Sequence, residues 1–335
     1  MKILILQLRR LGDVLMTTPM IRAIRDALPG ATVHVCVEPS SAPAIRNNPH
    51  VDAVVVARPG SFLRLLADLR RARYDIAVDT LGTPSSARLT FLSSASMRIG
   101  LARRWRAPFY THAVQPATEP RYSAVEKLAL LEPLGIRSTD CRIELFPSDE
   151  ERREADHVWS SLGLPGGGPV VAFSPVSRRE RKVWPADRFA EICDRWAERA
   201  GLRYLPLFGP GEEPMVEQVI RRLRHRNAAV YPCPPVSFGA LGPLLGRCSC
   251  YFGNDNGIRH VAIAAGIPTA AVFGPPNPVS WTPPGSTHDF CAGGCRPIRT
   301  VSVSEVDAMM AELLAACGRG VRPSAARQGE PAQPL

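Results

Sequence analysis

Residues 2–13 read Lys2-Ile-Leu-Ile-Leu-Gln-Leu-Arg-Arg-Leu-Gly-Asp13, an apolar run that two arginines and a glycine bring to an end. An unbroken apolar run of this length is typical of a strand buried on both faces of a parallel sheet. Gly12 breaks the run, and apolar residues then recur at helical spacing until residue 28. This opening predicts a parallel α/β domain.

The strand–helix alternation continues in both halves of the chain. In the first half we expect strands over 31–37, 51–56 and 76–79 and an amphipathic helix over 61–73. A second run begins near residue 169. It has strands over 170–173, 203–208, 250–252 and 269–273, and helices over 186–200, 212–225, 258–265 and 303–317. The pattern predicts two Rossmann-like domains whose parallel strands direct their carboxyl ends to a shared central cleft, where ligands of such sheets bind.

Composition shifts suggest the domain limits. We expect an N-terminal domain over 1–165, a C-terminal domain over 166–317 and a disordered tail over 318–335, where Gly, Arg, Pro, Ala and Gln dominate. The triglycine at 166–168 is the predicted hinge between the two domains.

Charge and composition limit the function classes. With 335 residues, 45% apolar and 21% charged, the chain is long and apolar enough for two folded domains. Its net charge of +10 favours anionic partners. No nucleic-acid-binding motif accompanies the charge, so we expect an anionic small molecule and an anionic lipid surface rather than nucleic acid.

Cysteine usage and hydropathy indicate the compartment. Nine cysteines, an odd number in a long chain, fit reduced cytosolic thiols better than a disulfide framework. Cys291 and Cys295 lack a second pair of ligands nearby, which argues against a zinc site. No stretch approaches the ~20 apolar residues of a membrane span. We therefore expect a cytoplasmic protein, in peripheral contact with the inner face of the inner membrane.

The loop after the first strand carries Asp13 at or near a helix N-terminus. An aspartate there commonly caps the helix by accepting amide hydrogen bonds. Alternatively, its carboxylate lies at the mouth of the cleft and accepts a proton from a hydroxyl group. Gly12 beside it would let a ligand approach the backbone. Both interpretations stay open on the residues alone.

The segment Phe252-Gly-Asn-Asp-Asn-Gly-Ile-Arg-His260 joins a strand to a helix. Free amides at such a helix start form a natural phosphate site. Asp255 fits as a helix cap or as a partner for ribose hydroxyls. His260 lies one turn into the helix, where a structural role and a role in the phosphate site are equally open.

Two further loops contribute candidates. The loop that begins at Ser174 carries Arg178, Arg179, Arg181 and Lys182, which form either a solvated charged loop or a clamp for a diphosphate. Near residue 210, Gly209 and Gly211 start a dinucleotide-binding pattern, but Pro214 replaces its third glycine. This departure argues against a nicotinamide enzyme. Glu212 or Glu213 remains available for a ribose.

Several familiar catalytic patterns are missing from the sequence. It contains no P-loop, no H-E-x-x-H, no G-x-S-x-G and no Asp-x-Asp pair after a strand. Without a visible pair of carboxylates for a divalent ion, we expect no metal and no cofactor.

A basic cluster lies over residues 98–106, which contain no acidic residue. Its members are Arg98, Arg103, Arg104 and Arg106, with Trp105 between the last two. Such a run is usually a solvated surface. Alternatively, it binds the carboxylates or phosphates of an anionic acceptor through paired hydrogen bonds.

These motifs resemble those of the lipopolysaccharide heptosyltransferases, glycosyltransferase family nine, which have the GT-B fold. The resemblance covers residues 1–317. It rests on three stretches: the opening Ile5-Leu-Gln-Leu-Arg-Arg-Leu-Gly-Asp13, the element Lys182-Val-Trp-Pro185, and Gly253-Asn-Asp-Asn-Gly257 with Phe273-Gly-Pro275 after it. The opening is most similar to the heptosyltransferase III branch.

The resemblance implies an inverting, metal-independent transfer of heptose from ADP-heptose to the inner core of lipopolysaccharide, an anionic glycolipid. It implies that Asp13 is the general base and that Lys182 binds phosphate. Asp255, Asn256, Gly257 and His260 would lie in the segment that binds the sugar donor, together with Ser174 and Glu212. The arginine cluster lies in the half that would bind the acceptor.

Two departures leave alternatives open. Asn256 stands where the family commonly has Ser or Thr, which removes a hydroxyl contact to phosphate, and the loop after Phe173 lacks a glycine often found there. The chain is then either a transferase, a non-catalytic paralogue that binds a nucleotide or glycolipid, or a GT-B nucleotide-sugar epimerase.

Overall fold

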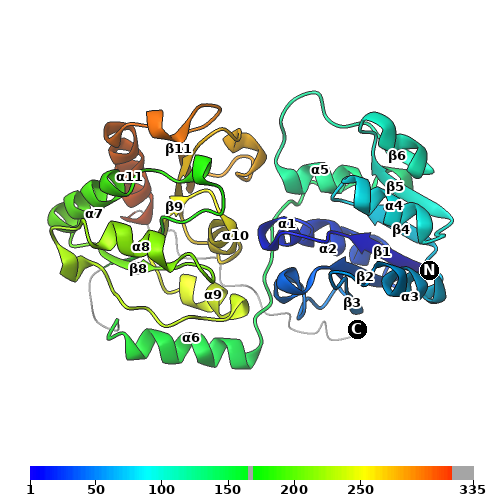
Figure 1. Ribbon diagram of the computed structural model, residues 1–335, viewed down its shortest axis with the longest axis horizontal. Coiled ribbons are helices and arrows are strands. Elements are labelled where there is room, and N and C mark those ends of the chain that lie inside the picture. The colour runs from blue at the N-terminus through cyan, green and yellow to red at the C-terminus, as the bar shows by residue number, and fades with distance from the viewer. Residues whose placement is uncertain (165–168, 319–335) are drawn as a thin grey trace, which may run out of the picture.

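Two fully parallel sheets organise the computed structural model, which describes residues 1–164 and 169–318 apart from the side chain of Arg104 (Figure 1). The first sheet has the order β3-β2-β1-β4-β5-β6. Its strands are β1 (Lys2–Leu6), β2 (Thr32–Val37), β3 (Ala53–Val56), β4 (Ile76–Asp79), β5 (Met97–Leu101) and β6 (His112–Val114).

Helices cover both faces of this sheet. They are α1 (Leu11–Leu15), α2 (Thr18–Ala27), α3 (Phe62–Ala72), α4 (Pro84–Leu92) and α5 (Ser123–Ala129), with 3-10 turns η1 (Pro39–Ala44), η2 (Arg104–Phe109) and η3 (Glu132–Leu134). Because side chains alternate along a strand, Ile3 and Ile5 join the core under α2 and α5, while Leu4 and Leu6 pack with α3 and α4.

The second sheet has the order β11-β10-β9-β7-β8. Its strands are β7 (Val170–Ser174), β8 (Arg203–Pro206), β9 (Cys250–Asn254), β10 (Thr269–Phe273) and β11 (Asp289–Gly293). Its helices are α7 (Ala186–Ala200), α8 (Glu213–Ile220), α9 (Phe238–Leu245), α10 (Gly257–Ala264) and α11 (Val303–Gly318). The 3-10 turns are η4 (Glu180–Lys182), η5 (Arg226–Ala228), η6 (Pro278–Ser280) and η7 (Ile298–Thr300).

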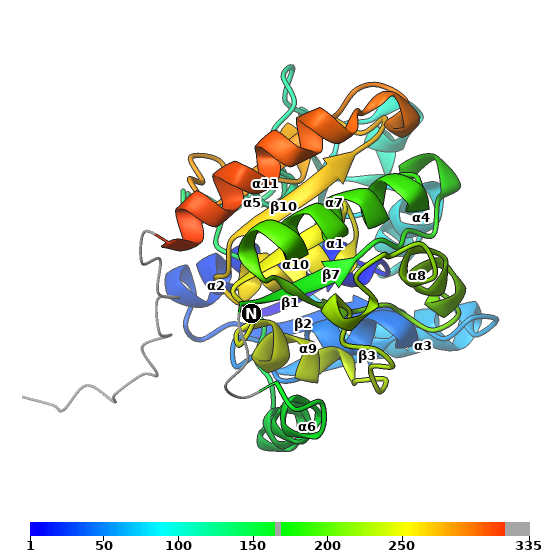
Figure 2. The same ribbon diagram turned by 90° about the vertical axis from the view of Figure 1, so that its left-hand side faces the viewer.

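The connecting helix α6 (Asp149–Ser161) packs on α9 and lies beneath the second sheet (Figure 1 and Figure 2). Ser148 caps it, since its hydroxyl accepts the amide of Glu151 at 3.2 Å while the Glu151 carboxylate accepts the amide of Ser148 at 2.7 Å. The domain boundary near residue 165 stays a prediction. The triglycine hinge at 166–168 and the tail beyond Gly318 lie outside the described residues.

The two domains meet through α1 and α10, which face each other across the centre of the molecule (Figure 1). Each of these helices directly follows the carboxyl end of a strand, β1 or β9. The carboxyl ends of those strands therefore point to the domain junction. The predicted α/β architecture of two parallel-sheet domains is confirmed.

One predicted helix is in fact two. The segment from residue 11 to 28 breaks between α1 and α2. Pro19 has no amide hydrogen, so it cannot donate the helical hydrogen bond to the Leu15 carbonyl. The hydroxyl of Thr17 donates to the Val14 carbonyl at 2.5 Å and that of Thr18 to the Leu15 carbonyl at 2.7 Å. The break leaves α1 as a short, separate helix at the junction.

No helix within the described ranges is both long and apolar enough to cross a membrane.

Candidate active site

Gly12 of α1 packs closely against α10 of the other domain. A β-carbon placed on this glycine would lie 2.7 Å from Cδ2 of His260 and 3.6 Å from Cα of Gly257. Asp13, the next residue, is partly exposed, and its Oδ2 accepts the amide of Arg10 at 3.4 Å. The carboxylate therefore makes a long capping contact and also lies next to the start of α10. Both predicted roles of Asp13 are compatible with this geometry.

Gly12→Ala is expected to disturb the junction, because real β-carbons do not approach another atom as closely as 2.7 Å. Overpacking of this kind typically costs about 1–3 kcal/mol. Since α1 carries Asp13, we expect catalytic turnover to fall at least about tenfold. Thermal unfolding and initial rates would measure both effects. Gly30→Ala is the matched control, because no atom lies within 4 Å of its new β-carbon; equal behaviour of the two variants would contradict the packing argument.

His260 lies on α10 opposite Gly12, with only 3% of its surface exposed. Burial lowers the pKa of His260 to about 4, although the charges of Asp255 and Asp13 both oppose this shift. Its Nδ1 is buried and has no hydrogen-bond partner among the described residues. At neutral pH the imidazole is therefore uncharged, and it lies within electrostatic reach of acidic groups from both domains.

The low pKa of His260 predicts a pH dependence of stability. Because the folded pKa, about 4, lies below the value of about 6.5 for an unfolded chain, the unfolded state binds more protons between these pH values. The free energy of unfolding should thus fall as pH drops from about 6.5 to about 4, by about 3 kcal/mol from this residue.

Chemical denaturation at several pH values, compared between the parent and His260→Gln, tests this. The variant should lose less stability over the same interval. Equal pH slopes for both proteins would contradict the burial of a neutral imidazole.

Lys182 and Asp255 form a close ion pair. The Lys182 Nζ lies 2.6 Å from Asp255 Oδ2, and the two side chains are 16% and 5% exposed. The second carboxylate oxygen of Asp255 is buried without a hydrogen-bond partner among the residues described. Lys182 Nζ also lies 5.5 Å from the ring centre of Trp281. The ammonium thus lies at the start of α10. This is where the resemblance to the family implies that a phosphate of the sugar donor binds.

Asn256 caps α10 with its side chain. Its Oδ1 accepts the amides of Ile258 at 2.9 Å and Arg259 at 3.2 Å, while its Nδ2 donates to Ser174 Oγ at 2.9 Å and to the Val176 carbonyl at 3.0 Å. This corrects the expectation of several free amides at the helix start, since Asn256 uses two of them. The amide of Gly257 precedes those two and is not used by the Asn256 side chain.

Ser174 is fully buried, and its hydroxyl accepts from Asn256, so it supports the cap instead of facing a ligand. Asn254, which no sequence motif indicated as functional, connects the end of β9 to the loop after β7 through two hydrogen bonds. Its Nδ2 donates to the Pro175 carbonyl at 2.7 Å, and its Oδ1 accepts the Trp184 amide at 3.2 Å. Glu212 is partly exposed and accepts the amide of Gly209 at 2.9 Å, which closes the glycine-containing turn before α8.

The predicted arginine cluster is spread along β5 and η2. Arg98 lies near the amino end of β5, where its guanidinium donates to the carbonyls of Ala95 at 2.8 Å and Phe109 at 3.2 Å. Arg103 and Arg106 lie beyond the carboxyl end of β5; Arg103 pairs with Glu126 at 2.8 Å and Arg106 donates to the Gly82 carbonyl. The side chain of Arg104 lies outside the described part. Arg98 therefore supports packing near the amino end of β5, away from the carboxyl end, where Arg103 and Arg106 lie.

Three residues near the junction gave no signal in the sequence. Arg259 is fully buried, and its guanidinium donates to the Trp281 carbonyl at 3.0 Å and to Thr282 Oγ1 at 3.1 Å. It thereby holds Trp281, whose ring centre lies 6.0 Å from that of His260. Lys127 on α5 is buried, which lowers the pKa of its ammonium, and the charge of Asp13 opposes this shift. Arg259 lies within the 252–260 segment, but no sequence pattern indicates the roles of these three side chains, because those roles depend on contacts between distant segments.

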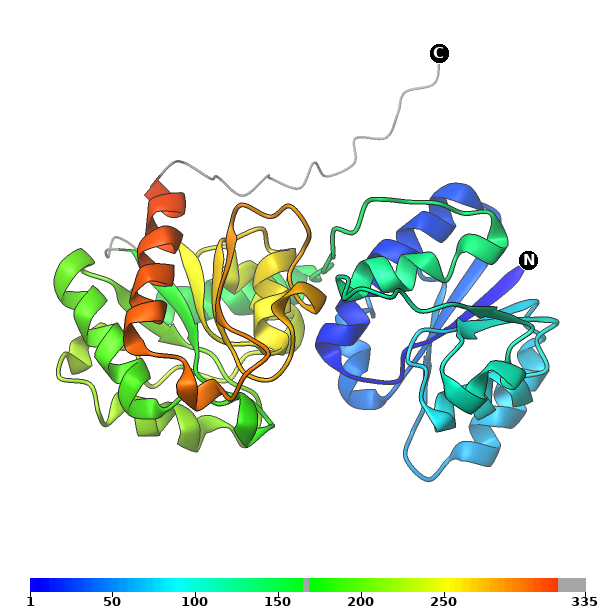
Figure 3. The same ribbon diagram turned by 90° about the horizontal axis from the view of Figure 1, so that it is seen from above.

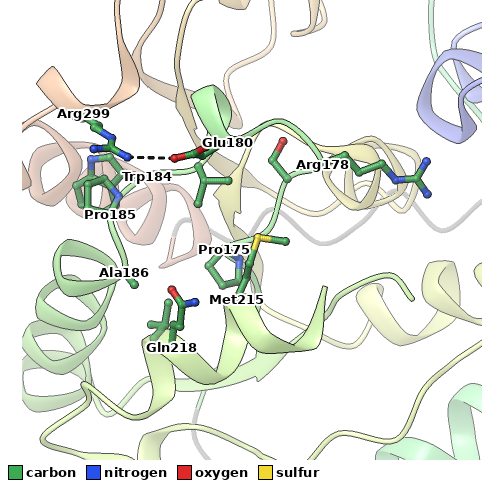
Figure 4. Close-up of a pocket in the computed structure, with 12 residues that line it drawn as sticks. Pro175, Arg178, Glu180, Trp184, Pro185, Ala186, Met215, Gln218 and Arg299 are labelled. Carbon is green, nitrogen blue, oxygen red and sulfur yellow. Dashed lines mark hydrogen bonds and ion pairs between the residues drawn. The ribbon is translucent and has the colours of Figure 1, made fainter. Parts of the chain in front are cut away.

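A cavity of about 660 Å³ lies behind the loop that carries Lys182 (Figure 4). Pro175, Trp184 and Met215 are among its lining residues, and Glu180 and Arg299 pair at its rim at 3.4 Å. Arg178 points away from it (Figure 4). Because none of Asp13, Lys182, Asp255 and His260 lines this cavity, the chemical groups gather at the domain junction and not there.

Within the residues described, no group of three or more His, Cys, Asp or Glu side chains is arranged to hold a metal ion. Cys295 is exposed, and Cys291 accepts a weak contact from Arg259 at 3.9 Å.

Two parallel-sheet α/β domains that meet at the carboxyl ends of their strands are the architecture of the GT-B fold. Residues 62–299 match the model of glycosyltransferase family 9 (heptosyltransferase), and the chain belongs to this family. It is 25% identical over 311 residues to lipopolysaccharide heptosyltransferase 3 of Escherichia coli, which covers 86% of this chain and 88% of the relative. The resemblance drawn from the motifs is thereby confirmed.

Solved structures share the same fold. A glycosyl transferase family 9 protein from Veillonella parvula superposes with a TM-score of 0.80 at 23% identity, covering 94% of this chain and 97% of that one. The E. coli heptosyltransferase WaaC with ADP gives a TM-score of 0.72 at 19% identity, covering 95% and 100%.

Proposed function

We propose that this protein transfers a heptose from ADP-heptose to the inner core of lipopolysaccharide, with inversion at the anomeric carbon and without a metal ion. The observation that carries the proposal is the α1–α10 junction, where Asp13 from one domain lies beside the donor-type segment of the other. Relatives support the substrates, since they include lipopolysaccharide heptosyltransferases and an E. coli heptosyltransferase solved with ADP-2-deoxy-2-fluoro heptose.

In the proposed reaction, Asp13 accepts the proton of an acceptor hydroxyl. The hydroxyl oxygen forms a bond to the anomeric carbon from the side opposite the diphosphate, while the bond from that carbon to the phosphate oxygen breaks. ADP leaves with the electron pair. The ammonium of Lys182 and the amide of Gly257 stabilise the charge that develops on the diphosphate, and they require no reorganisation because they are already in place.

Asp255 has two functions in this scheme. It fixes the Lys182 ammonium at 2.6 Å, and its charge keeps the buried pair balanced. We assign Asn256 and Ser174 to positioning of the helix start, His260 to contact with the sugar, and Glu212 to the ribose. Arg103 and Arg106 lie on the acceptor side, where an anionic glycolipid would need cations. We further propose that the reaction takes place in the cytoplasm.

Incubation of the purified protein with labelled ADP-heptose and a truncated inner-core acceptor tests this function. The expected result is label in the acceptor, equimolar with released ADP. Binding of ADP without turnover would indicate a non-catalytic paralogue. Conversion of the free nucleotide sugar without any acceptor would indicate an epimerase. Either result would overturn the proposal.

Chelation should leave the transfer rate unchanged, because Lys182 and Gly257 supply the charge stabilisation that a divalent ion gives in other transferases. Initial rates in excess EDTA and in excess magnesium should agree within about twofold. A complete loss of turnover in EDTA that magnesium restores would refute the metal-independent scheme.

A further inference from the structure

One face of the N-terminal domain carries an unusual share of the exposed apolar side chains. Four of the seven large hydrophobic residues that are exposed in the described ranges lie there: Phe62 (45%), Leu63 (79%), Phe91 (47%) and Trp105 (56%). They come from α3, α4 and η2, which cover the side of the sheet opposite α2 and α5 (Figure 3). We call residues 57–73 and 84–109 the α3–η2 face.

The same face carries a net positive charge almost equal to that of the whole chain. Residues 57–73 contain five arginines and one acid, Asp68, and residues 84–109 contain five arginines and no acid. Ten positive charges minus one negative charge give +9, compared with +10 for all 335 residues. Asp68 pairs with Arg71 at 3.3 Å. Arg58, Arg64 and Arg88 are exposed, and no described carboxylate lies within 4 Å of them.

The aromatic side chains of the face are held in place by packing and hydrogen bonds. Phe109 packs edge-on against both Phe91 and Trp105, with ring centres 5.8 and 6.1 Å apart. Just beyond η2, the Tyr110 hydroxyl donates to the buried Asp79 at 2.7 Å. On the other side, Arg70 Nε of α3 donates to the Leu92 carbonyl of α4 at 2.8 Å. The exposed side chains are therefore carried by elements that contact one another, α3 with α4 and α4 with η2.

We propose that the α3–η2 face binds the surface of an anionic phospholipid bilayer. Apolar side chains that enter the headgroup region, surrounded by arginines that meet lipid phosphates, are the combination such a surface requires. A second copy of the chain fits poorly, because arginines would oppose arginines. A nucleic acid would engage the arginines but would leave Leu63 exposed to water.

This inference deepens the proposed function, on which its biological purpose rests. The start of α3 follows β3, and η2 follows β5, so both lie toward the strand ends from which the Asp13 loop also emerges. A protein lying on a membrane by this face would bring the Asp13 edge close to the headgroups. An acceptor linked to lipid A would be presented there.

Co-sedimentation of the full chain with vesicles tests the proposal. The parent should bind vesicles that contain phosphatidylglycerol and should not bind pure phosphatidylcholine vesicles, and about 0.5 M salt should release it. The double variant Phe62→Ser/Leu63→Ser should bind at least about tenfold more weakly. Val279→Ser, which removes an apolar side chain that is 53% exposed in the other domain, is the matched control and should bind like the parent.

A second pair of variants tests the charge. Arg64→Glu/Arg88→Glu should weaken vesicle binding at least about tenfold. Arg153→Glu/Arg226→Glu changes the net charge equally at exposed positions on α6 and η5, outside the α3–η2 face, and it should weaken binding far less. Three results would overturn the proposal. The two charge-reversed pairs could lose vesicle binding equally, or the parent could bind both vesicle types equally. The parent could also form dimers that Phe62→Ser/Leu63→Ser converts to monomers.

The vesicles contain neither ADP-heptose nor a glycolipid acceptor, so their binding is independent of catalysis. Normal transfer to a soluble acceptor without vesicle binding would refute the membrane face alone. Vesicle binding as expected, with no transfer to any acceptor, would refute the proposed function and leave the membrane face intact. Unchanged melting temperature and ADP affinity establish that each variant is folded.

Discussion

Replacing Asp13 by Asn is expected to lower the transfer rate by about 10²–10⁴-fold, the usual contribution of a positioned general base. Asn keeps an oxygen that can accept the Arg10 amide, and Asn and Asp cap helices about equally well. The variant should therefore fold normally. ADP affinity should stay within about twofold of the parent, because Asp13 belongs to the domain opposite the Lys182–Asp255 pair.

Initial rates at saturating substrate, together with ADP titration calorimetry, separate the two interpretations of Asp13. A variant with near-normal turnover would show that the carboxylate is only a helix cap. Asp26→Asn, a change of the same type on the neighbouring helix α2, is the control and should transfer at the parent rate.

Lys182→Ala should weaken ADP binding and slow transfer together. A hydrogen bond between charged groups is typically worth about 1.5–3 kcal/mol, which corresponds to about 10–100-fold in ADP affinity. The loss in the transfer rate should be larger, since the contact strengthens as charge develops on the diphosphate. Calorimetry with ADP and initial rates measure the two effects.

Removing Lys182 also leaves Asp255 buried without its partner, and breaking such a pair typically destabilises a fold by about 3–5 kcal/mol. The double variant Lys182→Ala/Asp255→Asn removes this complication, because both charges are then absent. If Lys182 binds phosphate, the double variant still binds ADP weakly. Recovery of parent-like ADP affinity in the double variant would show that the lysine serves only to neutralise Asp255.

The strands near the centre of each sheet were predictable because their local signal is strong. Runs such as Ile76–Asp79 and Thr269–Phe273 are fully buried and apolar except for Asp79 and Thr269, and the structure places strands over these same residues. Strand β5 and the edge strands β6 and β11 were missed. The first two residues of β5, Met97 and Arg98, are partly exposed, so its apolar run is short. His112–Val114 is only three residues long, and Asp289–Gly293 is partly exposed, so neither carries an apolar run.

The candidate site was predictable only in part. Gly12, Asp13, Lys182 and the 253–260 segment were visible as loop motifs, yet their meeting at the junction depends on how α1 packs on α10. The capping role of Asn256 depends on the distant Ser174. Arg259, Trp281 and Lys127 act through contacts between segments far apart in the chain, and such contacts leave no pattern in neighbouring residues.

The central claim is that this protein adds one heptose to the lipopolysaccharide core. Mass spectrometry of lipopolysaccharide from a strain that lacks this protein tests it most directly, with the strain carrying the parent gene and one carrying Asp13→Asn as comparisons. The account predicts a core that is shorter by at least one heptose in the deletion and Asp13→Asn strains, and restored by the parent. An unchanged core in the deletion strain, or full restoration by Asp13→Asn, would contradict it.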